Sequence, residues 1–388
     1  MLEGGDMIVN LHNLPETPLC NEIKIKRAFV GDKGAILSFI GKHFQKNWVY
    51  EVEHSLMEDV SKCFIATENG EILGFACFDS SAKGFFGPIG VLPERRGENI
   101  GRAFHAANEE HPVFSDHLAK ELMTAEEYAT VQGYILSGAQ FFEPETDLTK
   151  QEPKELLRRL VNVHIAPSPL CRAAYTEQAL KAAVLTGTER YVILGAGMDT
   201  FAFRETEFLS KHKVFEVDHP LTQVDKKERI TRAGWTIPDN LTFVPVDFTK
   251  DNVAERLIAG GFDPSATSFF SCLGVTYYLS TEAIHAMLAA LSGLCAEGSM
   301  LVFDYPDEHF FTAPEKRVQN TIMMAKAGGE PMQSAFSHGE LEKVLGEHGF
   351  LIHELLTPDD IQKDIIDSAG SDLKAFEHVN YCLAVRKN

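Results

Sequence analysis

Two glycines follow an apolar run that favours a buried strand. Residues 191–204 read YVILGAGMDTFAFR, so the run is followed by Gly195, Ala196 and Gly197. Glycine lacks the Cβ atom that would keep a ligand away from the backbone. The dinucleotide fingerprint G-x-G-x-x-G/A would place Thr200 at its third position, which is a poor match. The turn therefore predicts a ligand close to the backbone, with weak support for a pyrophosphate.

Acidic residues end the next two strand-like runs. Asp218 ends KVFEVD, 21 residues after Gly197, and Asp247 ends FVPVD with Phe248 beside it. A carboxylate at the position of Asp218 can accept hydrogen bonds from both hydroxyls of a ribose, and the ring of Phe248 can cover a base. Either acid alone can equally cap a helix. Together, the glycine turn and the two acids favour an adenosine without phosphates, and S-adenosylmethionine (SAM) is such a ligand.

An alternation of strands and helices must position these residues. The candidate strands are residues 190–195, 213–218, 242–246, 267–273 and 299–304. Between the last two, the pattern predicts a helix with Ser280 or Thr281 as N-cap and Gly298 as a stop signal. Such alternation predicts an α/β protein with a mostly parallel, doubly wound sheet. Ligands of these sheets bind beyond the carboxyl ends of the strands, where the strand order reverses.

The sheet has further predicted neighbours. Near the C-terminus, FLIHELL and VNYCLAVRK are β-like runs that can pair antiparallel at the sheet edge. Residues 103–186 carry helical patterns and predict a helical lead-in or cap. Residues 23–102 predict a small, separate α+β unit with a hairpin that turns at Asn69-Gly70. We therefore expect two domains, residues 1–102 and 103–388, with a sheet-containing core from residue 187 onward.

Residues 103–388 resemble the leucine carboxyl methyltransferase superfamily, including its bacterial polyketide O-methyltransferase branch. The matching stretches are PVFSDHLAKEL, CRAAYTEQAL, YVILGAGMDTFAFR, VFEVDHPLTQVDKKE, LTFVPVDFTKD, GFDPSATSFFSCLGVTYYLS and GGEPMQSAF. The resemblance implies a seven-stranded class I methyltransferase sheet of Rossmann-like type, SAM as methyl donor and an oxygen atom as methyl acceptor.

The resemblance also implies roles for individual residues. The glycine turn at Gly195, Ala196 and Gly197 would line the methionine side of SAM, Asp218 would hold the ribose, Asp247 and Phe248 would bind the adenine, and Arg172 would pair with the SAM carboxylate. A guanidinium suits that pairing because it can bind a carboxylate with two parallel hydrogen bonds. Asp199 would support the glycine turn or cap the following helix, and Arg172 can alternatively be a solvated helix residue.

One stretch departs from the family pattern. Where much of the bacterial branch has Trp-Glu, this chain has Cys272-Leu273. If that glutamate contacts SAM, one contact is missing here. A non-catalytic SAM-binding module is therefore an alternative to a SAM-dependent O-methyltransferase.

The acceptor site is less clearly marked. Tyr277, Tyr278 and His164 can orient an acceptor, although each can also be an ordinary core or surface residue. An ionised carboxylate acceptor needs no base, whereas a phenol with a pKa near ~10 benefits from one. We expect an apolar pocket for a polyketide-like or aromatic small molecule, or else ordinary core, from Phe310, Phe311, Met323, Met324 and Phe336.

The N-terminal segment resembles half of a GNAT acetyltransferase. GVLPERRGENIGRA is similar to the acetyl-CoA loop of that family, in which loop amides bind a pyrophosphate at a helix N-terminus. Asn99 stands where a glycine is usual, and the later GNAT strand and helix are absent. We expect a structural role such as homodimerisation or a lid. Acyl-CoA binding, and with it a bifunctional enzyme, is the alternative.

The composition of the chain limits the kinds of partner, membrane association and metal site that we expect. The chain of 388 residues is 44% hydrophobic with a net charge of −20, and most of the excess acid follows residue 100. This charge disfavours nucleic acid and anionic membranes as partners. No apolar run approaches the ~18 residues of a membrane span. The 7 cysteines include no C-x-x-C pair, so we expect no metal site and a reduced, cytoplasmic setting.

Overall fold

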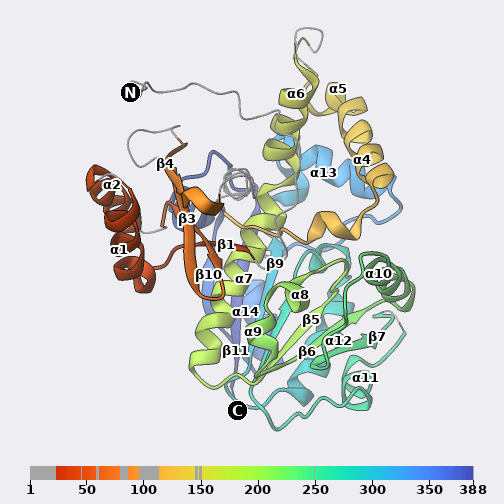
Figure 1. Cartoon of the computed structure of the whole chain (residues 1–388). Helices are drawn as coiled ribbons and strands as arrows, with labels where there is room; N and C mark the ends of the chain where they lie inside the picture. Colours follow the sequence, from red (N-terminus) through yellow and green to blue (C-terminus); the bar gives the residue numbers. More distant parts are fainter. Residues whose placement is uncertain are drawn as a thin grey trace. The chain divides into compact units, whose positions relative to one another are not determined.

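The computed structural model describes residues 23–44, 46–57, 61–78, 86–95, 113–144, 147, 151–248 and 250–387. The chain divides into two compact units, Met1–His111 and Pro112–Asn388. Figure 1 shows the elements of both units.

The first unit contains a four-stranded antiparallel sheet in the order β1-β2-β3-β4. Its strands are β1 (Lys24–Arg27), β2 (Cys63–Glu68), β3 (Glu71–Phe78) and β4 (Phe86–Val91), and its helices are α1 (Lys33–His43) and α2 (Lys46–Leu56). Asn69 and Gly70 have φ angles of 51° and 86°, as a two-residue type I′ hairpin turn requires. The predicted hairpin is therefore confirmed. Residues 96–101, on which the proposed acetyl-CoA loop depends, lie outside the described residues, so GNAT similarity stays a prediction.

The second unit contains a seven-stranded sheet in the order β10-β11-β9-β8-β5-β6-β7. Its strands are β5 (Arg190–Leu194), β6 (Lys213–Asp218), β7 (Leu241–Pro245), β8 (Ser268–Cys272), β9 (Met300–Pro306), β10 (Phe350–Leu356) and β11 (Val379–Arg386). Strands β5 to β9 are parallel to their neighbours in that group, and β11 is antiparallel to both β9 and β10. The doubly wound, mostly parallel seven-stranded sheet and the pairing of the two C-terminal runs are confirmed.

Both faces of this sheet are covered, because alternate residues of its central strands enter two different hydrophobic clusters. Tyr191 and Ile193 belong to one cluster, whereas Val192 and Leu194 belong to the other. A parallel strand buried on both faces is expected to be apolar throughout, as β5 is. The glycine turn after β5 thus starts from a strand whose position is fixed on both sides.

Helices and helical turns complete the second unit (Figure 1). The α-helices are α4 (Ala125–Ser137), α5 (Ala139–Phe142), α6 (Pro153–Leu160), α7 (Pro167–Leu185), α8 (Phe201–Arg204), α9 (Thr206–Leu209), α10 (Pro220–Arg232), α11 (Val253–Ala259), α12 (Thr281–Leu294), α13 (Lys316–Ala327), α14 (His338–Glu347) and α15 (Pro358–Ile361). The helical turns include a π-helical turn (Val161–Ile165) between α6 and α7. None of the helices in the described part of the chain combines the length and the apolar character needed to cross a membrane.

The boundaries of α12 show where the prediction was right and where it was wrong. The hydroxyl of Ser280 accepts a hydrogen bond from the Ala283 N–H, so Ser280 is the N-cap. The helix ends at Leu294, before the predicted stop at Gly298, and the extended backbone of Cys295 follows it. Gly298, with a φ of 82°, instead shapes the turn that leads into β9.

Candidate functional site

The glycine turn lies at the point where the strand order of the sheet reverses. Strand β5 has β6 on one side and β8 on the other. A Cβ atom on Gly195, whose φ is 73°, would lie 2.4 Å from Cγ2 of Val275, in the segment after β8. A Cβ atom on Gly197 would have no atom within 4 Å. Gly195 therefore permits close packing, and Gly197 faces open space that a ligand can use.

Asp218 reaches the same turn from the end of β6. Its Oδ2 accepts a hydrogen bond of 2.6 Å from the Gly197 N–H, and its Oδ1 accepts one of 2.6 Å from the His219 N–H. Each carboxylate oxygen can accept more than one hydrogen bond. Asp218 thus fixes the turn and keeps acceptor capacity for the hydroxyls of a ribose.

Asp247 and Phe248 follow β7, on the next strand of the sheet. The Val246 N–H donates to the Asp218 carbonyl at 2.8 Å, which brings the ends of β6 and β7 together. Asp247 Oδ2 accepts a hydrogen bond of 2.6 Å from Lys250 Nζ. Phe248 lines a cavity of about 510 Å³ beside α12. The structure therefore places the glycine turn, Asp218 and the Asp247-Phe248 pair along one edge of the sheet, a set of groups that fits SAM.

Asp199 caps the segment after the glycine turn. Its Oδ1 accepts a hydrogen bond of 2.7 Å from the Phe201 N–H, at the start of α8. The N-cap residue of α8 is Thr200, so Asp199 satisfies the first helical N–H from the preceding position, and its role in supporting the glycine turn stays a prediction.

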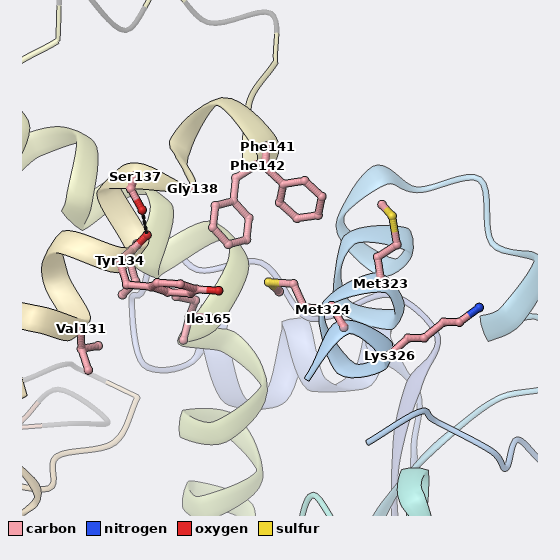
Figure 2. Close-up of a pocket in the computed structure, with 12 residues that line it drawn as sticks. Val131, Tyr134, Ser137, Gly138, Phe141, Phe142, Ile165, Met323, Met324 and Lys326 are labelled. Carbon is pink, nitrogen blue, oxygen red and sulfur yellow. Dashed lines mark hydrogen bonds between the residues drawn. The ribbon is translucent and has the colours of Figure 1, made fainter. Parts of the chain in front are cut away.

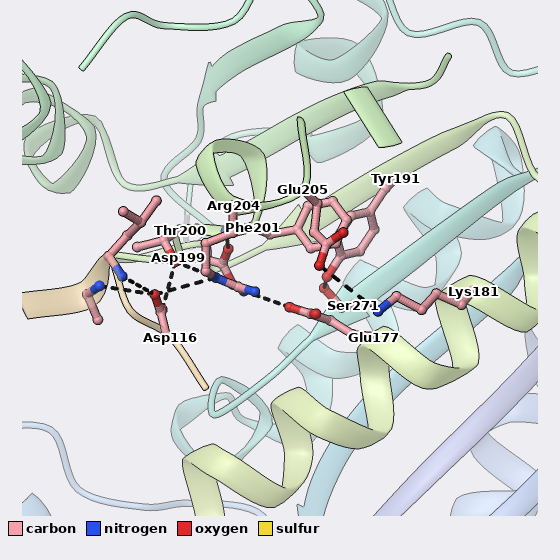
Figure 3. A network of polar contacts seen from close by, with 12 residues as sticks. Asp116, Glu177, Lys181, Tyr191, Asp199, Thr200, Phe201, Arg204, Glu205 and Ser271 are labelled. Atoms are coloured by element: carbon pink, nitrogen blue, oxygen red, sulfur yellow. Dashed lines mark hydrogen bonds and ion pairs between the residues drawn. The ribbon is translucent and has the colours of Figure 1, made fainter. Parts of the chain in front are cut away.

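A polar network that the sequence did not predict supports this turn (Figure 3). Thr200 donates to Asp116 Oδ2 at 2.7 Å, and Arg204 Nη2 lies 2.6 Å from Glu177 Oε1. Arg204 Nε also donates to the Thr200 hydroxyl at 2.8 Å. Burial raises the pKa of Glu177 although Arg204 opposes this shift. The network connects the lead-in segment, α7 and α8 directly behind the glycine turn.

Arg172 lies on α7 and is held by a buried acid. Its Nη1 donates to Asp304 Oδ2 at 2.9 Å, and Asp304 is fully buried within β9, two residues before the strand ends. The Gly274 N–H donates to Oδ1 of the same carboxylate at 2.6 Å, and the Tyr277 hydroxyl donates to Oδ2 at 2.9 Å. Asp304 was not predicted. It ends the candidate strand 299–304, so the reasoning applied to Asp218 and Asp247 could have identified it.

The predicted acceptor residues share one small chamber. His164, Arg172, Tyr277 and Tyr278 all line a cavity of about 270 Å³. Of the apolar residues predicted around the acceptor, Phe310 and Met324 also line this chamber. Phe336 is buried in the sheet core, the alternative that the sequence left open, and Phe311 is 43% exposed and does not line the chamber. Met323 lines a neighbouring groove instead.

His164 is the least satisfied polar side chain of the chamber. It lies in the π-helical turn, where the centroid of its ring is 5.0 Å from the centroid of the Phe142 ring. Neither ring nitrogen has a hydrogen-bond partner, and both are buried. Burial lowers the pKa of His164. The ring is therefore neutral at pH 7 and has a nitrogen that can accept a proton or a hydrogen bond.

At the end of β8, Cys272 and Leu273 stand where much of the bacterial branch has Trp-Glu, and neither carries a carboxylate. Cys272 is buried with its Sγ 3.9 Å from Sδ of Met287 on α12. Leu273 packs against the hydrophobic cluster on the opposite face of the sheet. Neither side chain can replace the acceptor oxygens of a glutamate, so the loss of one SAM contact remains our prediction.

Comparison with known proteins points to one family. Residues 97–292 match the family model described as leucine carboxyl methyltransferase. The chain is 40% identical over 291 residues to YktD of Bacillus subtilis (strain 168), named a putative S-adenosyl-L-methionine-dependent methyltransferase, covering 74% of this chain and 95% of that protein. A putative methyltransferase of the same description from Frankia alni is 31% identical over 227 residues, covering 57% of this chain and 71% of that protein.

Solved structures show only a distant likeness. A DUF574 family protein from Streptomyces avermitilis superimposes with a TM-score of 0.46 and 13% identity, covering 72% of this chain and 98% of that one.

Proposed function

Because the chain belongs to the leucine carboxyl methyltransferase family and is a SAM-dependent methyltransferase, we propose that it methylates an oxygen atom of a small molecule. SAM supplies a methyl group that is already activated on a sulfonium. The protein then has to align the acceptor with that methyl group and exclude water. Such positioning can lower the activation free energy by roughly 7–11 kcal/mol.

The residues along the sheet edge would hold the cofactor. Arg172, fixed in place by Asp304, would bind the SAM carboxylate. Asp218 would accept hydrogen bonds from the ribose, and Asp247 with Phe248 would contact the adenine. These are the roles that the family resemblance implies, and the open space at Gly197 and the cavity at Phe248 support them.

The observation that carries the proposal is the chamber of about 270 Å³ that His164, Tyr277 and Tyr278 share with Arg172. An acceptor in this chamber would lie beside the residue proposed to bind the methionine end of SAM. Of these side chains, neutral His164 can take the proton that a hydroxyl must lose during methylation. A carboxylate acceptor has no such proton and would gain nothing from a neutral imidazole. We therefore favour a hydroxyl acceptor over a carboxylate.

The first test is calorimetric titration of the protein with SAM. We expect a micromolar Kd for the native chain and at least ~10-fold weaker binding for Asp218→Ala, because this substitution removes the acceptor of the Gly197 N–H together with the ribose contact. Asp225→Ala is the matched control, since Asp225 lies on α10 and pairs with Arg229 on the helix surface. Native protein that does not bind SAM, or equal affinity in the two variants, would contradict the assigned site.

The second test separates an enzyme from a non-catalytic module. The SAM-loaded protein is incubated with a panel of phenols and of carboxylic acids, and methyl transfer is measured. Methylation of phenols supports the proposal, and methylation of carboxylates alone would contradict the role of His164. SAM binding without transfer to any member of a broad panel would instead favour the non-catalytic alternative.

A further inference from the structure

An apolar groove of about 930 Å³ lies between the helical lead-in and α13 (Figure 2). Tyr134 of α4 and Phe141 and Phe142 of α5 form one side, and Met323 and Met324 of α13 face them. Among the described residues that line this groove, Lys326 alone carries a charge. The groove therefore suits an apolar ligand.

Large apolar side chains of the groove are exposed. Tyr134 is 79% exposed and Met323 is 52% exposed. Val131, Phe141, Ile165 and Met324 are each at least 38% exposed. Exposed apolar surface concentrated at one place marks a binding site more often than scattered residues do. Flexible methionines can adapt to ligands of varied shape.

The groove adjoins the candidate acceptor chamber. Ile165 and Met324 line both cavities. Ile165 directly follows His164 in the π-helical turn, so one short segment borders the polar chamber and the apolar groove. A molecule held at His164 can therefore continue past Ile165 and Met324 into the groove.

The sizes of the two cavities favour an acceptor that occupies both. A cavity of ~150 Å³ holds one benzene molecule, so the chamber of about 270 Å³ has room for a head of one or two rings. Pockets for whole small molecules are typically ~300–1,000 Å³. The groove, at about 930 Å³, lies in that range.

We propose that the methyl acceptor is an elongated lipophilic molecule whose hydroxyl-bearing head enters the chamber while its alkyl or fused-ring body lies in the groove. This inference rests on the proposed function and adds the substrate class. Burial of the body would supply binding energy, and the fixed position of the head would place the oxygen.

The test measures binding of 4-methylphenol, 4-pentylphenol and 4-nonylphenol by calorimetry, without SAM and below the concentrations at which they aggregate. Burial of each methylene group corresponds to at most about fourfold in Kd. We expect 4-nonylphenol to bind at least ~10-fold more tightly than 4-pentylphenol, with 4-methylphenol weakest. Equal affinity across the series, or no binding of any member, would overturn the proposal.

Two groove variants locate the binding. Tyr134→Glu adds a charge at an exposed rim position where folding should tolerate it, and Met324→Glu adds one at the junction with the chamber. Each is expected to weaken 4-nonylphenol binding at least ~10-fold. The matched control is Leu185→Glu, at an 89% exposed position of α7 that is not part of the groove lining. Circular dichroism melting verifies that each variant is folded, and equal losses in the control would refute specific binding in the groove.

Failure of this inference can be told apart from failure of the proposed function. If binding strengthens with the length of the alkyl group and Tyr134→Glu abolishes this effect, the groove is supported as a binding site even if no phenol is methylated. Conversely, methylation of 4-nonylphenol with a rate and KM that Tyr134→Glu leaves unchanged would contradict the groove proposal and leave the O-methyltransferase proposal intact.

Discussion

Asp304 connects the residues proposed to bind SAM with those proposed to face the acceptor. Its carboxylate accepts hydrogen bonds from Arg172, the Gly274 N–H and the Tyr277 hydroxyl. Charge-assisted bonds of this kind fix geometry, and a buried carboxylate requires them because burial without partners is costly. The Tyr277 hydroxyl donates to Asp304, and burial with the nearby Asp304 charge raises its pKa well above the ordinary value. We therefore propose Tyr277 as a positioning residue and His164 as the proton acceptor.

His164→Gln should change the pH profile of phenol methylation. The native pKa is lowered by burial, so the imidazole is in its base form at and above pH 7, and we expect a nearly constant kcat/KM between pH 7 and 9. Without the imidazole the reaction needs preformed phenolate, so the rate of the variant should rise with pH toward the phenol pKa of ~10. Rates measured with 4-nonylphenol across this range provide the check.

A variant whose rate is reduced by the same factor at every pH would show that His164 has only a structural role. His309→Gln, on a surface residue next to Phe310, serves as a control and should leave the profile unchanged.

At the scale of elements, β6 and α10 are joined by a buried ion pair below the site. Lys226 Nζ lies 2.5 Å from Glu216 Oε2, and both side chains are 1% exposed. Gln223 on the same helix donates to the Glu216 carbonyl at 2.8 Å. Burial raises the pKa of Glu216 to about 7, although Lys226 opposes this shift. The position of α10 at the end of β6, directly after Asp218, thus depends on the pairing of these charges.

Lys226→Met should lower the free energy of unfolding by about 3–5 kcal/mol at neutral pH, because it leaves a buried carboxylate unpaired. The double variant Glu216→Leu with Lys226→Met should recover most of this loss. Urea denaturation followed by fluorescence of Trp235, which packs on Phe203 in the same unit, measures both. Lys343→Met, at a 78% exposed position, is the control.

The same variant has a predictable dependence on pH. The pKa of Glu216 is raised from 4.5 to about 7 in the folded state. Its ionisation is therefore less favourable in the folded protein than in the unfolded chain, so this group lowers the free energy of unfolding as the pH rises from about 4.5 to about 7. Removal of the ammonium group raises that pKa further and enlarges this cost. The stability deficit of Lys226→Met should therefore shrink as the pH approaches 4.5, and a deficit that is constant with pH would contradict the ion-pair explanation.

At the scale of the whole molecule, the chain combines two units that each have a core. Ile36, Ile40 and Phe75 centre the core of the first unit, and the two clusters on the sheet faces form that of the second. All of the residues assigned to SAM lie in the second unit. Whether the first unit dimerises or binds acyl-CoA stays a prediction.

Calorimetric melting should accordingly show two transitions, of which SAM raises only one. Ligand at ~100 times its Kd stabilises the unit that binds it by about 2.7 kcal/mol. Acetyl-CoA added separately should leave both transitions unchanged if the first unit is structural. A shift of the other transition by acetyl-CoA would instead favour the bifunctional alternative, and a single transition would contradict independent units.

The sequence by itself was sufficient to predict the sheet and its ligand-binding edge. Each central strand is a short apolar run, and the residue that ends it, such as Asp218 or Asp247, is read directly from the chain. Because the carboxyl ends of parallel strands meet at one edge, local order along the chain was enough to bring Gly197, Asp218 and Asp247 together.

Only the tertiary structure could decide the rest. Arg172 and Asp304 are 132 residues apart, and the unpartnered state of His164 depends on every element packed around it. The groove likewise forms where α4 and α5 face α13. Phe311 and Phe336 are chemically identical, yet one is 43% exposed and the other lies in the sheet core. Local periodicity shows that a side chain is apolar, whereas long-range packing decides whether it is covered by protein or left to contact a ligand.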